Sequence, residues 1–346
     1  MQGTATIVGA GIGGLAAARA LTAAGWDVTV LERGPFLSSA GTQLGIWPSA
    51  WRALERLGVA DHLTAGGAGL QRGEIRRPDG QVLAAFETRG NLRTVPRTEL
   101  LEALLAGLPP DTVQWSRTVG PERPAPPADV VVAADAIHSA VRAAAFPLAR
   151  VRDTQVVAFR GVAPIPAGQT SETWGSGLIF GISPFPGGGT NWYAGVAAGL
   201  AGERDGDWPG LLRALYSGWH ADVQRVLDAV PGDGVDRRRI EESVPLRSFV
   251  SANTVLLGDA AHAMAPHLGR GGCEALTDGL VLAECLLASP TVADGLARYD
   301  AARRRRSQRI VRASAAMSRV SNRTRRTGLR DGLIATAGRL AAARGS

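Results

Sequence analysis

The sequence predicts an α/β fold with a doubly wound parallel sheet, a second β-sheet and a helical C-terminal segment. Three observations support this prediction. A short apolar strand, a glycine-rich turn and an Ala-rich helical run open the chain, and a second strand–turn–helix unit follows residue 250. Between these units, β-prone runs alternate with Pro-Gly turns. A chain of 346 residues is long enough for one large domain or two modest ones with an ample core.

The first unit has the pattern of a dinucleotide site. The strand Thr4–Val8 leads into a G-x-G-x-x-G turn, a helix to Ala24 and a second strand, Asp27–Leu31, that ends at Glu32. The glycines permit a tight turn, close approach to a pyrophosphate and close helix packing, and the acid can accept ribose hydroxyls. The helix N-terminus offers unpaired N–H groups to phosphate. The turn residues are Gly9, Gly11, Ile12, Gly13 and Gly14. This Rossmann-type unit fits NAD and FAD equally.

The second unit places another strand end near the same site. The strand Asn253–Leu257 ends in Gly258-Asp259, and a glycine-rich stretch then enters a helix that runs to about Ala288. The positive end of that helix would stabilise an anion. A reduced flavin carries negative charge on its ring, so this arrangement favours a flavin. The stretch contains Pro266, Gly269, Arg270, Gly271 and Gly272.

Several motifs carry a family resemblance. They are the glycine turn with Glu32-Arg33, Arg97 in Val-Pro-Arg-Thr-Glu-Leu, and Leu-Leu-Gly-Asp-Ala-Ala-His ending at His262. In this order and spacing they resemble the single-component FAD-dependent aromatic hydroxylases, the class A flavoprotein monooxygenases typified by para-hydroxybenzoate hydroxylase. The segments Gly45–Ala50 and Trp174–Gly177 are most similar to the branch of urate hydroxylase, salicylate hydroxylase and zeaxanthin epoxidase.

The resemblance implies non-covalent FAD on a Rossmann-type FAD-binding domain. The glycine turn would hold the pyrophosphate, Glu32 the adenosine ribose, and Asp259 the ribityl-pyrophosphate region. Arg33, Arg97 and Asp135 would contact the cofactor, while residues 266–272 would line the flavin ring. It also implies that NADH or NADPH reduces the flavin. A hydroperoxide formed with O2 would then hydroxylate or epoxidise an electron-rich aromatic or polycyclic molecule.

Three features depart from the family pattern. Ala136 follows Asp135 where relatives have glycine, so we expect a reshaped turn, because alanine adopts positive φ at a cost. Arg270 replaces a glutamine, and three roles stay open for it: stabilising reduced flavin, holding an anionic substrate, or facing solvent. The segment 115–129 is short and proline-rich, which indicates a deleted hairpin and a stiff connector.

The nucleotide domain is expected to be discontinuous. We assign residues 1–65, 90–150 and 250–290 to it, residues 66–89 and 151–249 to an inserted β-sheet substrate domain, and residues 291–346 to Arg-rich C-terminal helices. Substrate would lie between the inserted sheet and the flavin. The candidates for contacting it are Phe159, Ile179, Trp192 and His267. No catalytic residue is certain, and His267 and Arg270 are the candidates.

Two other functions stay open. One is an FAD-dependent dehydrogenase, reductase or redox-neutral tailoring enzyme without oxygen insertion, which Ala136 and Arg270 motivate. The other is a non-catalytic flavin-binding protein that uses the Arg-rich C-terminal helix. A hydrolytic triad is not expected, because the chain lacks a G-x-S-x-G elbow.

Composition narrows the possible partners. The net charge is +7 and all 38 basic residues counted as Lys or Arg are arginines, but they are dispersed, so no nucleic acid is expected. Two cysteines, taken as reduced, do not make a metal site. No apolar run is long enough for a membrane span, and we expect a cytoplasmic monomer or homodimer. An apolar stripe at Ile310, Ala313, Met317 and Val320 is expected to dock on its own domain or on a second subunit.

Overall fold

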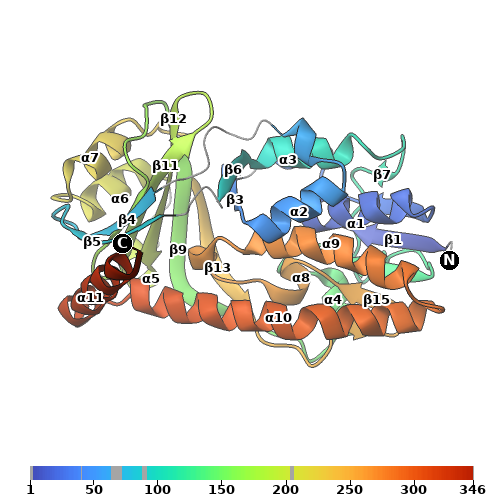
Figure 1. Ribbon diagram of the computed structural model, residues 1–346. Coiled ribbons are helices and arrows are strands. Elements are labelled where there is room, and N and C mark those ends of the chain that lie inside the picture. The colour runs from blue at the N-terminus through green and yellow to red at the C-terminus, as the bar shows by residue number, and fades with distance from the viewer. Residues whose placement is uncertain (1–2, 40, 64–71, 88–91, 203–205, 346) are drawn as a thin grey trace.

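The computed structural model describes residues 3–39, 41–63, 72–87, 92–202 and 206–345. It confirms the predicted fold class: a parallel nucleotide-binding sheet, a second β-sheet and C-terminal helices (Figure 1). The joins predicted near residues 65, 66, 89 and 90 fall in stretches 64–71 and 88–91, which lie outside the described residues.

The first sheet has six strands in the order β14-β15-β8-β1-β2-β7, and all pairs except β14 with β15 are parallel. Its inner strands are apolar on both sides because helices pack against both faces. The strands are β1 (Thr4–Val8), β2 (Asp27–Leu31), β7 (Val113–Gln114), β8 (Val130–Ala133), β14 (Val250–Ser251) and β15 (Thr254–Leu256). The helices are α1 (Ile12–Ala23), α3 (Arg97–Leu105), α4 (Ala140–Ala145), α8 (Asp259–His262) and α9 (Gly271–Leu287).

A small unit lies beside the entrance to α9. It comprises the antiparallel pair β3 (Gln43–Ile46) and β6 (Arg93–Pro96), α2 (Pro48–Arg56) and the 3-10 turn η1 (Ala60–His62). A second 3-10 turn, η2 (Pro266–Leu268), precedes α9. Figure 1 shows β3 and β6 between the two large sheets.

The second sheet has seven strands in the order β13-β9-β12-β11-β10-β4-β5. They are β4 (Arg72–Arg76), β5 (Val82–Glu87), β9 (Val151–Ala163), β10 (Ser171–Trp174), β11 (Leu178–Phe185), β12 (Gly189–Ala197) and β13 (Asp236–Ser243). One face, here called the helix-side face, packs on α5 (Ala198–Ala201), α6 (Trp208–Leu215) and α7 (Ala221–Asp228). The opposite face is here called the nucleotide-side face, because it contacts the β3 segment through Asn191 and Ser183.

Two helices end the chain. The long α10 (Val292–Ser321) runs along the lower edge of the molecule in Figure 1, from beneath β15 to beneath β9, and α11 (Thr327–Gly345) packs on β5. Three residues of the predicted α10 stripe, Ala313, Met317 and Val320, are exposed and do not dock on their own domain, whereas Ile310 is half-buried. Docking of the stripe on a second subunit stays a prediction. The helix instead buries a face that carries four serines and Arg303, since small side chains permit close packing and Arg303 has acidic partners.

The structure describes both places where the backbone was expected to depart from the family pattern, the turn at Ala136 and the segment 115–129. The turn at Ala136 is not reshaped: Ala136 has φ +65, so alanine adopts the conformation that glycine occupies more readily. Between β7 and β8 the chain forms turns with one isolated bridge, Gly120 to Arg123, and no hairpin strands. The expected connector is therefore present.

We predict that Ala136→Gly stabilises the protein. Relief of the positive φ is worth about 1–2 kcal/mol, and the greater freedom of an unfolded glycine offsets about 0.4–1 kcal/mol of that. Urea unfolding of the FAD-loaded protein should show a net gain of up to about 1.6 kcal/mol. The control Ala143→Gly, in the exposed face of α4, should instead lose about 0.5–1 kcal/mol. A loss of stability in Ala136→Gly would contradict the strained turn.

Candidate active site

The β1–α1 turn is shaped for a ligand. Gly9 has φ +104, and a Cβ there would lie 2.4 Å from the Ala134 carbonyl oxygen. A Cβ at Gly14 would lie 1.9 Å from the Gly9 oxygen, so only glycine lets helix and strand approach this closely. At Gly11, by contrast, a Cβ would meet no described atom within 4 Å. The turn therefore leaves open space where a pyrophosphate would approach the N-terminus of α1.

Glu32 is held over this turn by backbone donors. Its Oε2 accepts the Ala10 N–H at 2.7 Å and its Oε1 accepts the Gly34 N–H at 2.8 Å. These bonds orient the carboxylate and leave further lone pairs for ribose hydroxyls. Arg33 is exposed beside it.

The end of β8 contributes Asp135. Its Oδ2 accepts the Val141 N–H at 3.3 Å, whereas its buried Oδ1 has no partner among the described residues. Nearby, Arg142 donates to the Ala260 carbonyl at 2.9 Å. This bond joins the β8 turn to the α8 turn, so two strand ends of the site are held together.

Arg97, Asp259 and Arg160 bring the two sheets into electrostatic contact. Asp259 is exposed at the start of α8, and Arg97 is half-buried at the start of α3. Burial and the neighbouring Arg160 lower the pKa of Arg97, while Asp259 opposes that shift. Because Arg160 belongs to β9 of the second sheet, both sheets contribute charge to one site.

The loop before α9 has the room and the orphaned polar atoms expected of a cofactor site. A Cβ at Gly269 would meet nothing within 4 Å in the described chain. The buried atoms His267 Nδ1 and Arg270 Nε, on either side of it in the chain, have no hydrogen-bond partner in the described part of the protein, and neither has Gln43 Oε1 of β3. Gly271 and Gly272 open α9, whose 17 residues direct a helix N-terminus at this loop. The residues present therefore fit a large polar cofactor.

Arg270 does not face solvent. Its Nη2 donates to Glu274 at 2.7 Å, its guanidinium lies 5.6 Å from the Trp47 ring centroid, and its side chain is 21% exposed. Pairing with Glu274 fixes the position of the cation at the start of α9. Two of the predicted roles, at the flavin and at an anionic substrate, stay open.

His267 is a neutral imidazole. Asn322 Nδ2 donates to its Nε2 at 2.9 Å, and burial lowers the pKa of His267 to about 4. The contact joins η2 to the end of α10. His262, the other histidine of this region, is buried and structural.

A buried charge network supports the loop from below. Asp278 of α9 accepts the Gly258 N–H at 2.9 Å, His262 Nε2 at 2.6 Å and Arg303 Nε at 2.6 Å. Arg303 also donates to Glu274 at 2.6 Å. Burial raises the pKa of Asp278, but Arg303 and His262 outweigh it and bring that pKa to about 2.

Sequence reasoning missed this network. Arg303 was assigned only to the Arg-rich C-terminal helices, without a partner, yet the residue is 3% exposed. A signal was present: Glu274 and Asp278 lie four residues apart in an otherwise apolar helix, hence on one face. Two buried acids on one helix face require cationic partners.

The predicted substrate contacts are partly corrected. Phe159 and Trp192 lie in the core between the helix-side face and α6, with 0% exposure, so they do not reach the nucleotide-side face. Side chains alternate along a strand, and the neighbours Arg160 and Tyr193 take the nucleotide-side positions. Ile179 has that orientation but is 2% exposed. His267 stays next to this face through Asn322.

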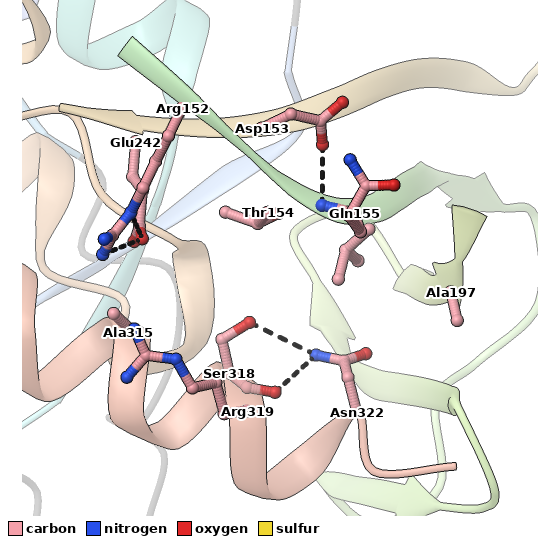
Figure 2. A pocket seen from close by; sticks show the side chains of 11 residues that line it. Arg152, Asp153, Thr154, Gln155, Ala197, Glu242, Ala315, Ser318, Arg319 and Asn322 are labelled. Carbon is pink, nitrogen blue, oxygen red and sulfur yellow. Dashed lines mark hydrogen bonds and ion pairs between the residues drawn. The ribbon is translucent and has the colours of Figure 1, made fainter. Parts of the chain in front are cut away.

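A polar pocket of about 470 Å³ lies at one end of the nucleotide-side face (Figure 2). It is lined by the beginning of β9, by Glu242 and by α10, including Ser318, Arg319 and Asn322. Within it, Arg152 pairs with Glu242 at 2.5 Å. Asn322 lines this pocket and also bonds His267, so it lies between the pocket and residues 266–272.

Comparisons with known proteins agree with this geometry. Residues 4–108 match the family model described as FAD dependent oxidoreductase, and residues 234–314 match that of an FAD binding domain. The chain is 33% identical to aurachin C monooxygenase/isomerase of Stigmatella aurantiaca, covering 90% of this chain and 88% of that protein. It is 29% identical to FAD-dependent urate hydroxylase of Klebsiella pneumoniae, covering 89% and 87%.

A solved structure is similar over nearly the whole chain. Klebsiella pneumoniae HpxO in complex with FAD and uric acid has a TM-score of 0.86 and 26% identity, covering 96% of this chain and 91% of that one. Among the described residues, no helix is long and apolar enough to cross a membrane, and no cluster of His, Cys, Asp and Glu is arranged to hold a metal ion.

Gly11→Val should abolish tight FAD binding without unfolding the protein. The new side chain enters space that the described chain leaves empty, so it obstructs the ligand and not the fold. We expect FAD affinity, measured by titrating the apoprotein, to fall at least about 100-fold. Gly120→Val is the matched control, because its Cβ also meets no described atom within 4 Å but lies in the connector. Equal FAD affinity in both variants would place the pyrophosphate elsewhere.

Asp278→Asn should cost about 3–5 kcal/mol of folding stability, because it leaves Arg303 buried without its main counter-charge. The folded pKa of about 2 lies below the unfolded value of about 3.9. The Asp278 contribution is therefore complete above about pH 4 and is lost as the pH falls towards 2. Urea unfolding at several pH values should show the gap between wild type and variant narrowing below about pH 4, and again as the pH rises through the His262 pKa, because Asp278 is what raises that pKa.

The contribution of His262 to folding stability depends on pH in the opposite direction. Burial alone lowers its pKa, but Asp278 outweighs burial and raises it, so this contribution is complete below about pH 6.5 and lost as the pH rises through the folded pKa. The control Glu284→Gln, which removes an exposed pair with Arg56, should change stability by less than about 1 kcal/mol. If Asp278→Asn and Glu284→Gln lose similarly small amounts of folding stability, the role given to Asp278 is contradicted.

Proposed function

The chain belongs to the FAD-dependent monooxygenases, and on that premise we propose that it hydroxylates or epoxidises an electron-rich aromatic small molecule with NADH or NADPH and O2. Bound FAD would supply the redox chemistry, taking electrons from the nicotinamide and activating oxygen. The protein's own residues bind and orient the partners and exclude water.

One observation carries this proposal: the loop from Gly258 to Gly272 is joined to the second sheet. The Ser243 N–H of β13 donates to the Ala263 carbonyl at 2.9 Å. His267 also bonds Asn322, which lies next to Gly195 of β12. The orphaned atoms of Gln43, His267 and Arg270 support a ring system at this junction. The N-terminus of α9 and the nearby Arg270 favour negative charge on such a ring. An aromatic molecule between that ring and the sheet would be shielded from water on both sides.

The relatives support an aromatic substrate. One is a urate hydroxylase, another an aurachin C monooxygenase/isomerase, and the similar solved structure binds FAD and uric acid. The alternative function, an FAD-dependent dehydrogenase, reductase or redox-neutral enzyme, was based in part on Ala136. That support is weaker, because Ala136 has the positive φ that glycine adopts readily.

We assign the cofactor contacts as follows. The glycine turn and Glu32 would bind the adenosine half, Arg97, Asp135 and Asp259 the middle, and residues 266–272 the flavin ring. We further propose the domain division at residues 1–65, 90–150 and 250–290 for the nucleotide domain, and a cytoplasmic monomer or homodimer as the working form.

The function is tested by anaerobic reduction followed by isotope labelling. Holoenzyme is mixed with NADH or NADPH, and flavin absorbance is followed with and without uric acid or 4-hydroxyquinoline. The reduced enzyme is then mixed with ¹⁸O2. We expect a nicotinamide to bleach the flavin and one ¹⁸O atom to enter the product. Reduction by a nicotinamide without labelled product would favour the dehydrogenase or reductase. If only a chemical reductant bleaches the flavin, the monooxygenase cycle is contradicted.

A further inference from the structure

One row of side chains crosses the nucleotide-side face of the second sheet. Register pairs Arg160 of β9 with Tyr193 of β12, Tyr193 with Gly181 of β11, and Gly181 with Glu172 of β10. On the other flank, Arg160 pairs with Asp236 of β13. Adjacent strands are about 4.8 Å apart, so these residues form a continuous line at right angles to the strands.

The middle of the row is a hydrogen-bonded phenol and carboxylate. The Tyr193 hydroxyl donates to Glu172 Oε1, and Trp174 Nε1 donates to Glu172 Oε2 at 2.8 Å. The tyrosine ring lies across Gly181, where a Cβ would be 2.1 Å from a ring carbon. Glycine at this position therefore lets the ring lie flat on the sheet and reach Glu172.

On either side of the row, β12 is in contact with residues outside the second sheet. At one end of β12, Asn191 Oδ1 accepts the Thr42 hydroxyl at 2.5 Å. At the other, Gly195 faces Asn322, whose Oδ1 would lie 3.6 Å from a Cβ there, and Asn322 binds His267. The pocket in Figure 2 begins beyond Asn322. Tyr193, midway between Asn191 and Gly195, thus lies between the contact with Thr42 and the contact through Asn322 with His267.

Arg160 and Glu172, the two charged residues of the row on β9 and β10, lie on opposite sides of Tyr193. Arg160 donates to Asp236 at 2.7 and 2.9 Å and lies near Arg97 and Asp259 of the nucleotide unit. Glu172, at the other end, has two neutral donors as its hydrogen-bond partners, and burial raises the pKa of its carboxyl group.

Other charged groups lie around these residues. His267 is neutral because burial lowers its pKa to about 4. From α11, Arg330 lies 5.7 Å from the Trp174 ring centroid and pairs with Asp331 at 2.8 Å. Neither group donates a hydrogen bond to Glu172.

We propose that this row selects a substrate with a nitrogen-containing aromatic ring that bears an oxo or hydroxyl group and an acidic ring N–H. Arg160 binds the ring oxygen, Tyr193 is the catalytic residue that contacts the acidic N–H, and Glu172 acts through Tyr193. The inference rests on the proposed function and names its substrate class.

The step is a proton transfer that balances without a redox partner. The substrate N–H bond breaks, its proton passes to the Tyr193 oxygen, and the tyrosine proton passes to Glu172 Oε1. The electron pair stays on the ring, Glu172 becomes neutral, and the new negative charge is shared with the ring oxygen beside Arg160. An ionised ring is more electron-rich and therefore accepts an electrophilic oxygen more readily.

The test compares Glu172→Gln and Tyr193→Phe with Glu87→Gln, an exposed carboxylate on β5 of the same sheet. Uric acid, 4-hydroxyquinoline and the carbocyclic comparator salicylate are titrated into FAD-loaded enzyme while flavin and ligand absorbance are followed across the pH range in which each ligand ionises, bound and free. We expect the heterocycles to bind wild type at least about tenfold more tightly than salicylate, and to ionise on the enzyme about one pH unit below their solution value. Glu87→Gln should keep that shift and the other two variants should lose it.

Turnover separates a catalytic role from a structural one. The kcat of Glu172→Gln and Tyr193→Phe for a heterocycle should fall at least about tenfold and recover as the pH passes the substrate's own pKa. Arg160→Gln should mainly raise KM. FAD content in Glu172→Gln and Tyr193→Phe should stay close to wild type. Arg160 lies near the cofactor contacts Arg97 and Asp259, so its variant is compared with wild type at equal FAD loading. Loss of flavin reduction or of ¹⁸O incorporation in wild type would count against the proposed function instead. Preference for salicylate, or an unchanged ionisation shift in both variants, would overturn the row's role.

Discussion

The Asp278 carboxylate is the interaction on which the arrangement of the site depends. It lies on α9 and accepts hydrogen bonds from the Gly258 backbone, from His262 and from Arg303 of α10. Three stretches distant from one another in the chain thereby meet at one buried charge. A buried carboxylate is stable only with such partners, so removing any one of them leaves the others uncompensated.

The network lies directly behind the loop from Asp259 to Gly272. It fixes the turn after β15 and the first turns of α9, and through Glu274 it also holds Arg270. The groups that would face a flavin are therefore supported by a charge cluster and not only by apolar packing. Preorganised groups of this kind need not reorient as charge develops on a bound ring.

The second constraint is the two-residue period of the second sheet. Phe159 and Trp192 fill the core against α6, and this obliges Arg160 and Tyr193 to face the nucleotide unit. The packing that stabilises the sheet thus decides which side chains a substrate meets. A shift of one residue in register would exchange the two sets.

Local patterns predicted the nucleotide turn, because the roles of Gly9, Gly14 and Glu32 depend on neighbours a few residues away. The helix entry after Gly258 and the positions of the strands were predictable for the same reason. The identity of the substrate-facing residues was not, since Phe159 and Trp192 are as β-prone as their neighbours and only sheet pairing decides which face they take. The pairs of Arg303 with Asp278 and Tyr193 with Glu172 join residues 25 and 21 positions apart, on different elements, and no local periodicity indicates them. At Ala136 the propensity argument was wrong because the surrounding turn imposes the positive φ that alanine disfavours.

The most direct test of the account is an experimental structure of the holoenzyme with FAD and uric acid. We expect a flavin ring between residues 266–272 and the nucleotide-side face, with a uric acid oxygen near Arg160 and a ring N–H within hydrogen-bonding distance of the Tyr193 hydroxyl. A ligand bound in the pocket between β9 and α10, or a flavin ring away from the Gly269 loop, would contradict it.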